Sequence, residues 1–257
     1  MSSMSNMSSV SKLPALTVAF WIMKVSATTL GETVGDLFSM TWQLGYAAST
    51  VLWLALFAVA IVGQLVVTRY VPPLYWFVIL TTSTAGTTLS DFMDRTLGLG
   101  YALGSAALAT TLALVLGAWR ASEGSLSVGE LRSRRAELFY WLAILVSNTL
   151  GTAVGDFLAD DSGLGFAGGA LLIAGAIAVV VAMFLVTRVS RVGLFWCAFV
   201  LTRPLGATVG DLLTKGQEAG GLGLGTVGAS LVLGAVLLSL VAGDWWRSSR
   251  QPRSRQR

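Results

Sequence analysis

Long uncharged runs alternate with shorter apolar runs along this chain of 257 residues. The long runs cover residues 37–68, 96–119, 162–187 and 219–243. Each of them exceeds the roughly 20 helical residues that cross about 30 Å of hydrocarbon. The shorter apolar runs lie around residues 13–31, 72–90, 138–155 and 192–210. The alternation predicts an all-α membrane protein with eight transmembrane helices.

Each shorter run ends in a six-residue motif that starts with glycine and closes with aspartate. The four copies are Gly31–Asp36, Gly86–Asp91, Gly151–Asp156 and Gly206–Asp211. Their aspartates are 55, 65 and 55 positions apart, and an aromatic–tryptophan pair keeps these offsets fifteen residues upstream. The tryptophans of the pairs are Trp21, Trp76, Trp141 and Trp196. Landmarks that recur together at one period indicate an internal fourfold repeat.

The repeats divide the chain into two halves of two repeats each. We predict a disordered N-terminal tail at 1–12, repeats at 13–69, 70–119, 138–188 and 189–243, a cytoplasmic loop at 120–137 and a basic cytoplasmic tail at 244–257. Each repeat is expected to be a helical hairpin that starts and ends on the same side, which makes the repeats parallel. Their uncharged second helices are expected to form the lipid-facing shell.

Composition supports a membrane protein. The chain is 54% hydrophobic and 12% charged, whereas a soluble domain carries roughly 25% charged residues. Mean hydropathy is +0.74. The chain has no histidine and a single cysteine, Cys197, which removes a disulfide framework and the commonest ligand of zinc and copper.

Basic residues concentrate in segments that alternate with pairs of helices. They are Lys12, Arg69, Arg120, Arg132, Arg134, Arg135, Arg188, Arg191, Arg247, Arg250, Arg253, Arg255 and Arg257, which makes 13 of the 17 lysines and arginines. The positive-inside rule places these segments, and both termini, in the cytoplasm. The tryptophans follow the basic segments closely, and we expect them at the membrane interface. The basic tail favours a topology anchor over a contact with nucleic acid or lipid headgroups.

Small residues give the motif its first interpretation, helix packing. Spacings of the GxxxG type let helix backbones approach closely inside a membrane. The residues concerned are Gly31, Gly35, Gly86, Ser90, Gly151, Gly155, Gly206 and Gly210. Packing leaves the aspartate unexplained. A carboxylate at the C-terminal end of a helix opposes the helix dipole, and capping of the following loop is the alternative to a shared binding site.

The four aspartates are therefore candidate ion ligands, about 22 Å above their tryptophans by helix rise. Only the first copy adds Glu32 and Lys24, and only the fourth adds Arg203, followed by Pro204, which should kink or unwind its helix. The candidate ion-binding residues are Glu32, Asp36, Asp91, Asp156 and Asp211, with Lys24 and Arg203 as internal counter-charges. Oxygen ligands suit a hard cation or a proton, and the four aspartates are the hypothetical metal ligands.

Four tandem two-helix repeats, each with a tryptophan and a G-x-x-x-[GS]-D segment, resemble a bacterial membrane-protein family built from a fourfold repeat of unknown function, repeat family 347. The resemblance covers about residues 15–243. It implies a fold of tandem repeats and a multi-pass location in the bacterial inner membrane. It implies little chemistry.

The residues favour a secondary transporter or exporter of a hard inorganic cation. Mn²⁺ is the first ion to test, and protonation of the same carboxylates would drive its release. A cation channel with a ring of aspartates and a membrane scaffold without transport are the alternatives. We expect no enzyme, because the chain lacks a nucleophile–base pair, and no cofactor or nucleic-acid partner. The expected partners are the lipid bilayer and an inorganic cation, a proton or both, and the oligomeric state is left open.

Overall fold

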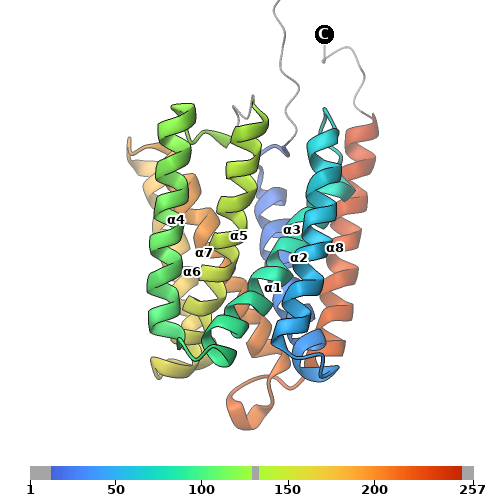
Figure 1. Ribbon diagram of the computed structural model, residues 1–257, viewed down its shortest axis with the longest axis vertical. Coiled ribbons are helices and arrows are strands. Elements are labelled where there is room, and N and C mark those ends of the chain that lie inside the picture. Colours follow the sequence, from blue (N-terminus) through green and yellow to red (C-terminus); the bar gives the residue numbers. More distant parts are fainter. Residues whose placement is uncertain (1–12, 129–132, 251–257) are drawn as a thin grey trace, which may run out of the picture.

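A computed structural model describes residues 13–128 and 133–250 of the chain. The predicted tail at 1–12 lies outside the described residues, as do 129–132 of the predicted loop and 251–257 of the basic tail. Within the described part the protein is entirely helical (Figure 1). Two predicted segments, the loop 120–137 and the tail 244–257, overlap observed helices. The chain is helical to Glu123 and again from Arg134, inside the predicted loop 120–137, and the last helix runs through position 244 to Arg250.

Each repeat supplies a first helix and a second helix. The first helices are α1 (Val18–Asp36), α3 (Pro72–Asp91), α5 (Arg134–Asp156) and α7 (Arg191–Thr214). The second helices are α2 (Tyr46–Val66), α4 (Tyr101–Glu123), α6 (Gly165–Val186) and α8 (Gly225–Arg250). Helix α7, the first helix of the fourth repeat, continues through Pro204, so the expected unwinding there is not seen.

The motif aspartate marks the end of the α-helix in three repeats. There the chain continues as one π-helical turn, η1 (Leu37–Thr41), η2 (Phe92–Thr96) or η4 (Phe157–Asp161). A π turn widens the helix, and such turns are frequent at functional sites. In the fourth repeat α7 runs three residues past Asp211, and a short 3₁₀ turn, η5 (Gln217–Ala219), follows instead.

The four first helices form a closed ring at the centre of the molecule. Around it α1 packs on α3, α3 on α5, α5 on α7, and α7 on α1. Each second helix packs against the first helix of the next repeat: α2 on α3, α4 on α5, α6 on α7 and α8 on α1. Contacts between the two helices of one repeat are fewer: α7 and α8 touch, and α6 contacts η4, the turn that continues α5. The predicted hairpins are therefore not pairs of helices packed mainly on each other: the second helix of each repeat packs mainly on the first helix of the next repeat.

Six described helices are long and apolar enough to cross a membrane: α2, α4, α5 with η4, α6, α7 and α8. The outer helices α2, α4, α6 and α8 bury only 28%, 22%, 17% and 17% of their apolar windows, as expected for a lipid-facing shell. Helices α1 and α3 are not among the six. Charged residues in α1 and a run of threonines in α3 lower their hydropathy, and both lie in the central ring.

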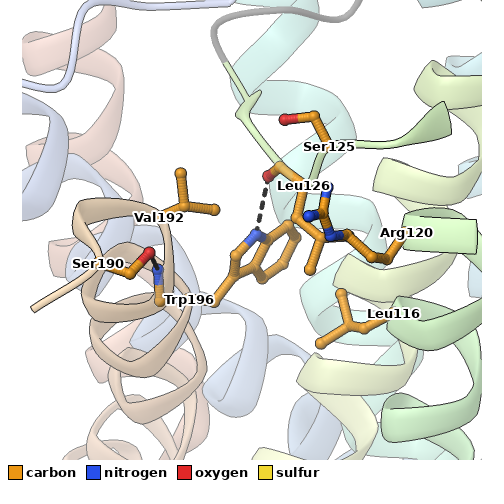
Figure 2. A pocket seen from close by; sticks show the side chains of 8 residues that line it. Leu116, Arg120, Ser125, Leu126, Ser190, Val192 and Trp196 are labelled. Carbon is orange, nitrogen blue, oxygen red and sulfur yellow. Dashed lines mark hydrogen bonds between the residues drawn. The ribbon is translucent and has the colours of Figure 1, made fainter.

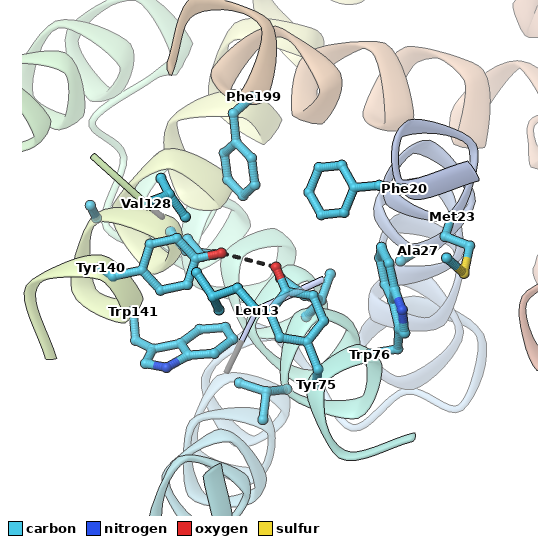
Figure 3. Packing of buried hydrophobic residues seen from close by; sticks show 14 of the residues in the cluster. Leu13, Phe20, Met23, Ala27, Tyr75, Trp76, Val128, Tyr140, Trp141 and Phe199 are labelled. Atoms are coloured by element: carbon cyan, nitrogen blue, oxygen red, sulfur yellow. Dashed lines mark hydrogen bonds between the residues drawn. The ribbon is translucent and has the colours of Figure 1, made fainter. Parts of the chain in front are cut away.

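An aromatic cluster closes the ring at the end where the first helices begin (Figure 3). The hydroxyl groups of Tyr75 and Tyr140 lie 2.9 Å apart across it. Trp76, Trp141 and Trp196 are buried, and Trp21 is only partly exposed. The expectation that these four indoles face the membrane interface is thus wrong for three of them, because neighbouring aromatic rings and the outer helices cover them.

A buried column of charged residues as the candidate functional site

Positions four residues apart on each first helix share one face, and in this ring that face is buried. Three levels follow along it, each about 6 Å from the next by helix rise. The aspartate level holds Asp36, Asp91, Asp156 and Asp211, the Glu32 level holds Glu32, Thr87, Thr152 and Ala207, and the Arg203 level holds Thr28, Ser83, Asn148 and Arg203. All twelve residues are at most 4% exposed. The repeat-equivalent residues therefore form one column.

The motif glycines bring the helices close enough to build this column. A Cβ atom at Gly86 would lie 2.8 Å from Cβ of Asn148 and 2.9 Å from the backbone of α5. In the same way Gly31 faces Ser83, and Gly206 faces Thr28. The first glycine of each motif thus packs against the Arg203 level of the next helix around the ring.

The second small residue of the motif packs one turn further along. Gly35, Gly155 and Gly210 face Thr87, Ala207 and Glu32, which belong to the Glu32 level. Ser90 replaces glycine in the second copy, and its hydroxyl group donates to Asp94 Oδ2 at 3.2 Å. The small residues have close interhelical contacts at both levels, which is the geometry that small-xxx-small spacings allow.

Arg203 crosses the ring at its centre. Its Nη2 lies 2.8 Å from Oε2 of Glu32 on α1, and both side chains are buried. The same Nη2 donates to the hydroxyl oxygen of Thr152 on α5 at 2.7 Å and to that of Thr87 on α3. The guanidinium group of Arg203 thus contacts all three other helices of the ring and fills the axis at the Glu32 level.

Glu32 and the threonines complete a connected polar network. The hydroxyl groups of Thr87 and Thr152 also lie 3.2 Å and 3.5 Å from Glu32 Oε2. Arg203 Nη1 donates to the carbonyl oxygen of Thr28, and Nη2 also donates to that of Ser83, both at 3.4 Å. Buried charges need such partners, since an unpaired one is costly in a low-dielectric interior.

Two cations divide the aspartate level into pairs. Lys215 Nζ lies 2.8 Å from Asp36 Oδ2 and 3.2 Å from Asp211 Oδ1. Arg95 lies 3.0 Å from Asp91 and 3.5 Å from Asp156. Each cation follows its own aspartate by four residues and links it to a neighbouring helix.

Arg95 and Lys215 are site residues that sequence reasoning missed, because both lie beyond the apolar runs 72–90 and 192–210 that predict the first helices. The missing signal was the same spacing of four: extending the column by one turn beyond Asp91 and Asp211 reaches Arg95 and Lys215. Burial lowers the pKa of Lys215, but the carboxylates of Asp36 and Asp211 more than offset this and raise it above its ordinary value.

Three carboxylates come together at the centre. Oxygen atoms of Glu32, Asp156 and Asp211 all lie within 4.8 Å of one another, and all three residues are buried. Two oxygens on opposite sides of a Ca²⁺ ion are about 4.6–5.2 Å apart, and about 4.0–4.2 Å apart around Mg²⁺. The cluster is therefore of the size of a hard-cation site. Asp36 and Asp91 are outside this triplet.

Lys24 is not brought to the carboxylates. Its Nζ is buried, has no hydrogen-bond partner among the described residues and lies 4.2 Å from the ring centroid of Phe199. Of the two counter-charges proposed from the sequence, only Arg203 contacts an acid of the motif region. Counting Glu32 and the four aspartates against Arg95, Arg203 and Lys215 leaves two negative charges in the connected site.

The fold and the buried column define a multi-pass helical membrane protein built from four repeats. The sequence profile of the family described as "Repeat of Unknown Function (DUF347)" matches residues 19–70, 74–125, 139–190 and 194–251. The chain belongs to this family, as its repeats predicted. No curated protein and no solved structure matches it.

Proposed function

We propose that this chain is a secondary transporter or exporter of a hard inorganic cation, with protons as the coupling ion. The observation that carries the proposal is the buried triplet Glu32, Asp156 and Asp211, with carboxylate oxygens within 4.8 Å of one another. Intramembrane acids are costly and mark ion pathways and proton relays. Mn²⁺ is the divalent ion to test first.

The proposed topology has eight transmembrane helices, with both termini in the cytoplasm of a bacterial inner-membrane protein. The first helices begin, and the second helices end, at one end of the molecule (Figure 1). The described basic residues Arg69, Arg120, Arg134, Arg135, Arg188, Arg191 and Arg247 belong to segments at that end, which supports a cytoplasmic assignment. Helices α1 and α3 count as spans in this proposal because the outer helices shield them from lipid.

Transport would exploit competition for the same oxygens. A cation between Glu32, Asp156 and Asp211 competes with Arg203 for Glu32 and with Lys215 for Asp211. Protons compete in the same way, since a protonated carboxyl group no longer attracts a cation. Binding of the cation on one side of the membrane and protonation on the other would then exchange the cation for protons. After the cation leaves, Arg203 and Lys215 would return to Glu32 and Asp211 and stabilise the empty site.

The filled axis favours a carrier over a channel. Arg203 occupies the centre of the ring, and the Tyr75–Tyr140 pair closes it nearer the aromatic end. An ion could pass only after these contacts rearrange, which is typical of alternating access rather than of an open pore. A scaffold role without transport is the remaining alternative, and it does not require the buried carboxylates.

Flux in proteoliposomes tests the proposal. Mn²⁺ flux driven by an imposed pH gradient is expected for the wild type and lost in Asp156→Asn and Asp211→Asn. The matched control is Asp161→Asn, which removes an exposed carboxylate near the same end and should transport normally. Equal flux in all four proteins, or flux that does not saturate and ignores the pH gradient, would reject the carrier.

A binding measurement separates loss of the ion site from loss of transport. Mn²⁺, Mg²⁺, Ca²⁺ and Na⁺ are titrated against thermal unfolding of the purified protein, because a ligand that binds the native state raises stability. Stabilisation by one of these ions should disappear in Asp156→Asn and persist in Asp161→Asn.

A further inference from the structure

A cavity opens between the end of α4 and the beginning of α7, away from the charged column (Figure 2). Its volume is about 520 Å³. Its polar wall contains Arg120, Ser125 and Ser190, and its apolar wall contains Leu116, Val192 and Trp196. The cavity therefore has a cationic polar part and a hydrophobic part.

The position of the cavity is that of a membrane–water boundary. Helices α4 and α7 are both long and apolar enough to cross a membrane, and the cavity lies where the first ends and the second begins. A ligand there has its polar part among headgroups and its apolar part beside the hydrocarbon. This position selects an amphipathic ligand.

The polar wall offers donors and no acid. Arg120 is exposed and forms no ion pair with any residue of the described chain. The hydroxyl oxygens of Ser125 and Ser190 accept from the backbone N–H groups of Ser127 and Gly193, so both hydroxyl groups keep a hydrogen to donate. None of the residues that line the cavity is an aspartate or glutamate. A planar guanidinium fork beside hydroxyl donors is the chemistry that recognises phosphate.

The apolar wall is held in place. Trp196 Nε1 donates to the carbonyl oxygen of Leu126 at 3.2 Å, which fixes the indole plane beside Arg120 (Figure 2). Arg191, the first residue of α7, has its guanidinium group over the ring of Phe184, at 4.1 Å from its centroid. Arg120, and not Arg191, therefore supplies the guanidinium group that lines the cavity. The indole and aliphatic side chains beside Arg120 form a surface for acyl chains.

We propose that this cavity binds the phosphate headgroup of an anionic glycerophospholipid, with Arg120 as its principal phosphate ligand. Basic pockets between transmembrane helices bind such headgroups. The bound lipid would link α4 of the second repeat to α7 of the fourth and so join the two halves of the chain. The inference is independent of the proposed transport activity.

Lipid-dependent stability tests the site. The purified protein in a neutral detergent is supplied with phosphatidylglycerol, with phosphatidylcholine or with inorganic phosphate, and its thermal unfolding is measured. Phosphatidylglycerol is expected to raise the midpoint by several degrees. Phosphatidylcholine, whose choline cation would meet Arg120 in a cavity without an acidic lining residue, and inorganic phosphate, which lacks acyl chains, should have little effect. Arg120→Gln should weaken the apparent affinity for phosphatidylglycerol by about tenfold, the loss expected for one charge-assisted contact.

Arg69→Gln is the matched control, because it removes one exposed arginine at the same end of the molecule and outside the cavity. It should leave the lipid effect unchanged. Equal losses in the two variants would reject a specific site in favour of a diffuse charge effect. Equal stabilisation by both lipids would reject recognition of the headgroup charge, and stabilisation by inorganic phosphate alone would identify a small-anion site and overturn the lipid proposal. None of these outcomes depends on cation flux.

Discussion

Oε2 of Glu32 and Nη2 of Arg203 lie 2.8 Å apart, although these residues belong to the first and the last repeat. Neither has an equivalent of its own charge in the other repeats: their levels otherwise hold threonine, serine, asparagine and alanine. The pair therefore breaks the fourfold pattern at one point on the axis and ties α1 to α7.

Removing one partner of this pair should be more harmful than removing both. Arg203→Met or Glu32→Gln alone is expected to lower the free energy of unfolding by about 3–5 kcal/mol, because an uncompensated charge is left buried. The double variant Glu32→Gln/Arg203→Met should lose less than the sum. A double-mutant cycle measured by unfolding in detergent checks this, and additive losses would show that the two side chains are not coupled.

Lys24 should behave in the opposite way. Because its buried ammonium group has no hydrogen-bond partner among the described residues, Lys24→Met is expected to raise the free energy of unfolding by about 1–3 kcal/mol, the cost of an unsatisfied buried polar group. Thermal unfolding of the two proteins at one pH gives the answer. A less stable Lys24→Met protein would mean that the contact of Lys24 Nζ with the Phe199 ring outweighs its missing hydrogen bonds.

Substitution of a motif glycine should destabilise the protein where the glycine packs against the backbone of the next helix in the ring. Gly86→Ala is expected to cost about 1–3 kcal/mol, because its Cβ would lie 2.9 Å from backbone atoms of α5. Gly175→Ala on α6 has open space around it and serves as the control, with unchanged or raised stability. Unfolding midpoints of both variants distinguish close packing from a general intolerance of glycine substitution.

The pH dependence of stability should report on Lys215. Its pKa is raised in the folded protein above its ordinary value of 10.5. A raised pKa stabilises the fold fully below the unfolded value, and the contribution is lost as the pH rises through the folded value. Lys215→Gln should therefore lower the unfolding midpoint by a constant amount between pH 6 and about pH 10, with the difference closing only at higher pH. A difference that already closes near pH 8 would contradict the Asp36–Lys215–Asp211 contact.

The four repeats and the helical fold could be predicted from the sequence, because the length of apolar runs and the spacing of repeated motifs do not depend on which helices are neighbours. Residues Glu32, Asp156 and Asp211 could also be singled out, since a carboxylate in an apolar run is conspicuous. The contacts of these residues could not be predicted, because the sequence does not indicate which helices are neighbours in the ring. The spacing of four that brings Arg95 and Lys215 to the aspartates is present in the sequence, but the apolar runs that predict the first helices end before these two residues.

The order of helices around the ring was beyond sequence reasoning for a related reason. Short connections favour hairpins whose two helices pack together. Here the second helix finds a better partner in the first helix of the next repeat, and the closure of α8 on α1 makes the arrangement cyclic. That choice depends on the packing of whole helix surfaces.

The cyclic packing of repeats within one chain allows a charge distribution that four identical repeats could not have. In a symmetric assembly of four separate copies, a glutamate or an arginine at one level would meet three identical charges around the same axis. Joining the repeats in one chain lets each level carry different residues, so that one acid and one arginine can meet where symmetry would force repulsion. The covalent connection thus allows a single polarised centre, with Glu32 on one side and Arg203 on the other.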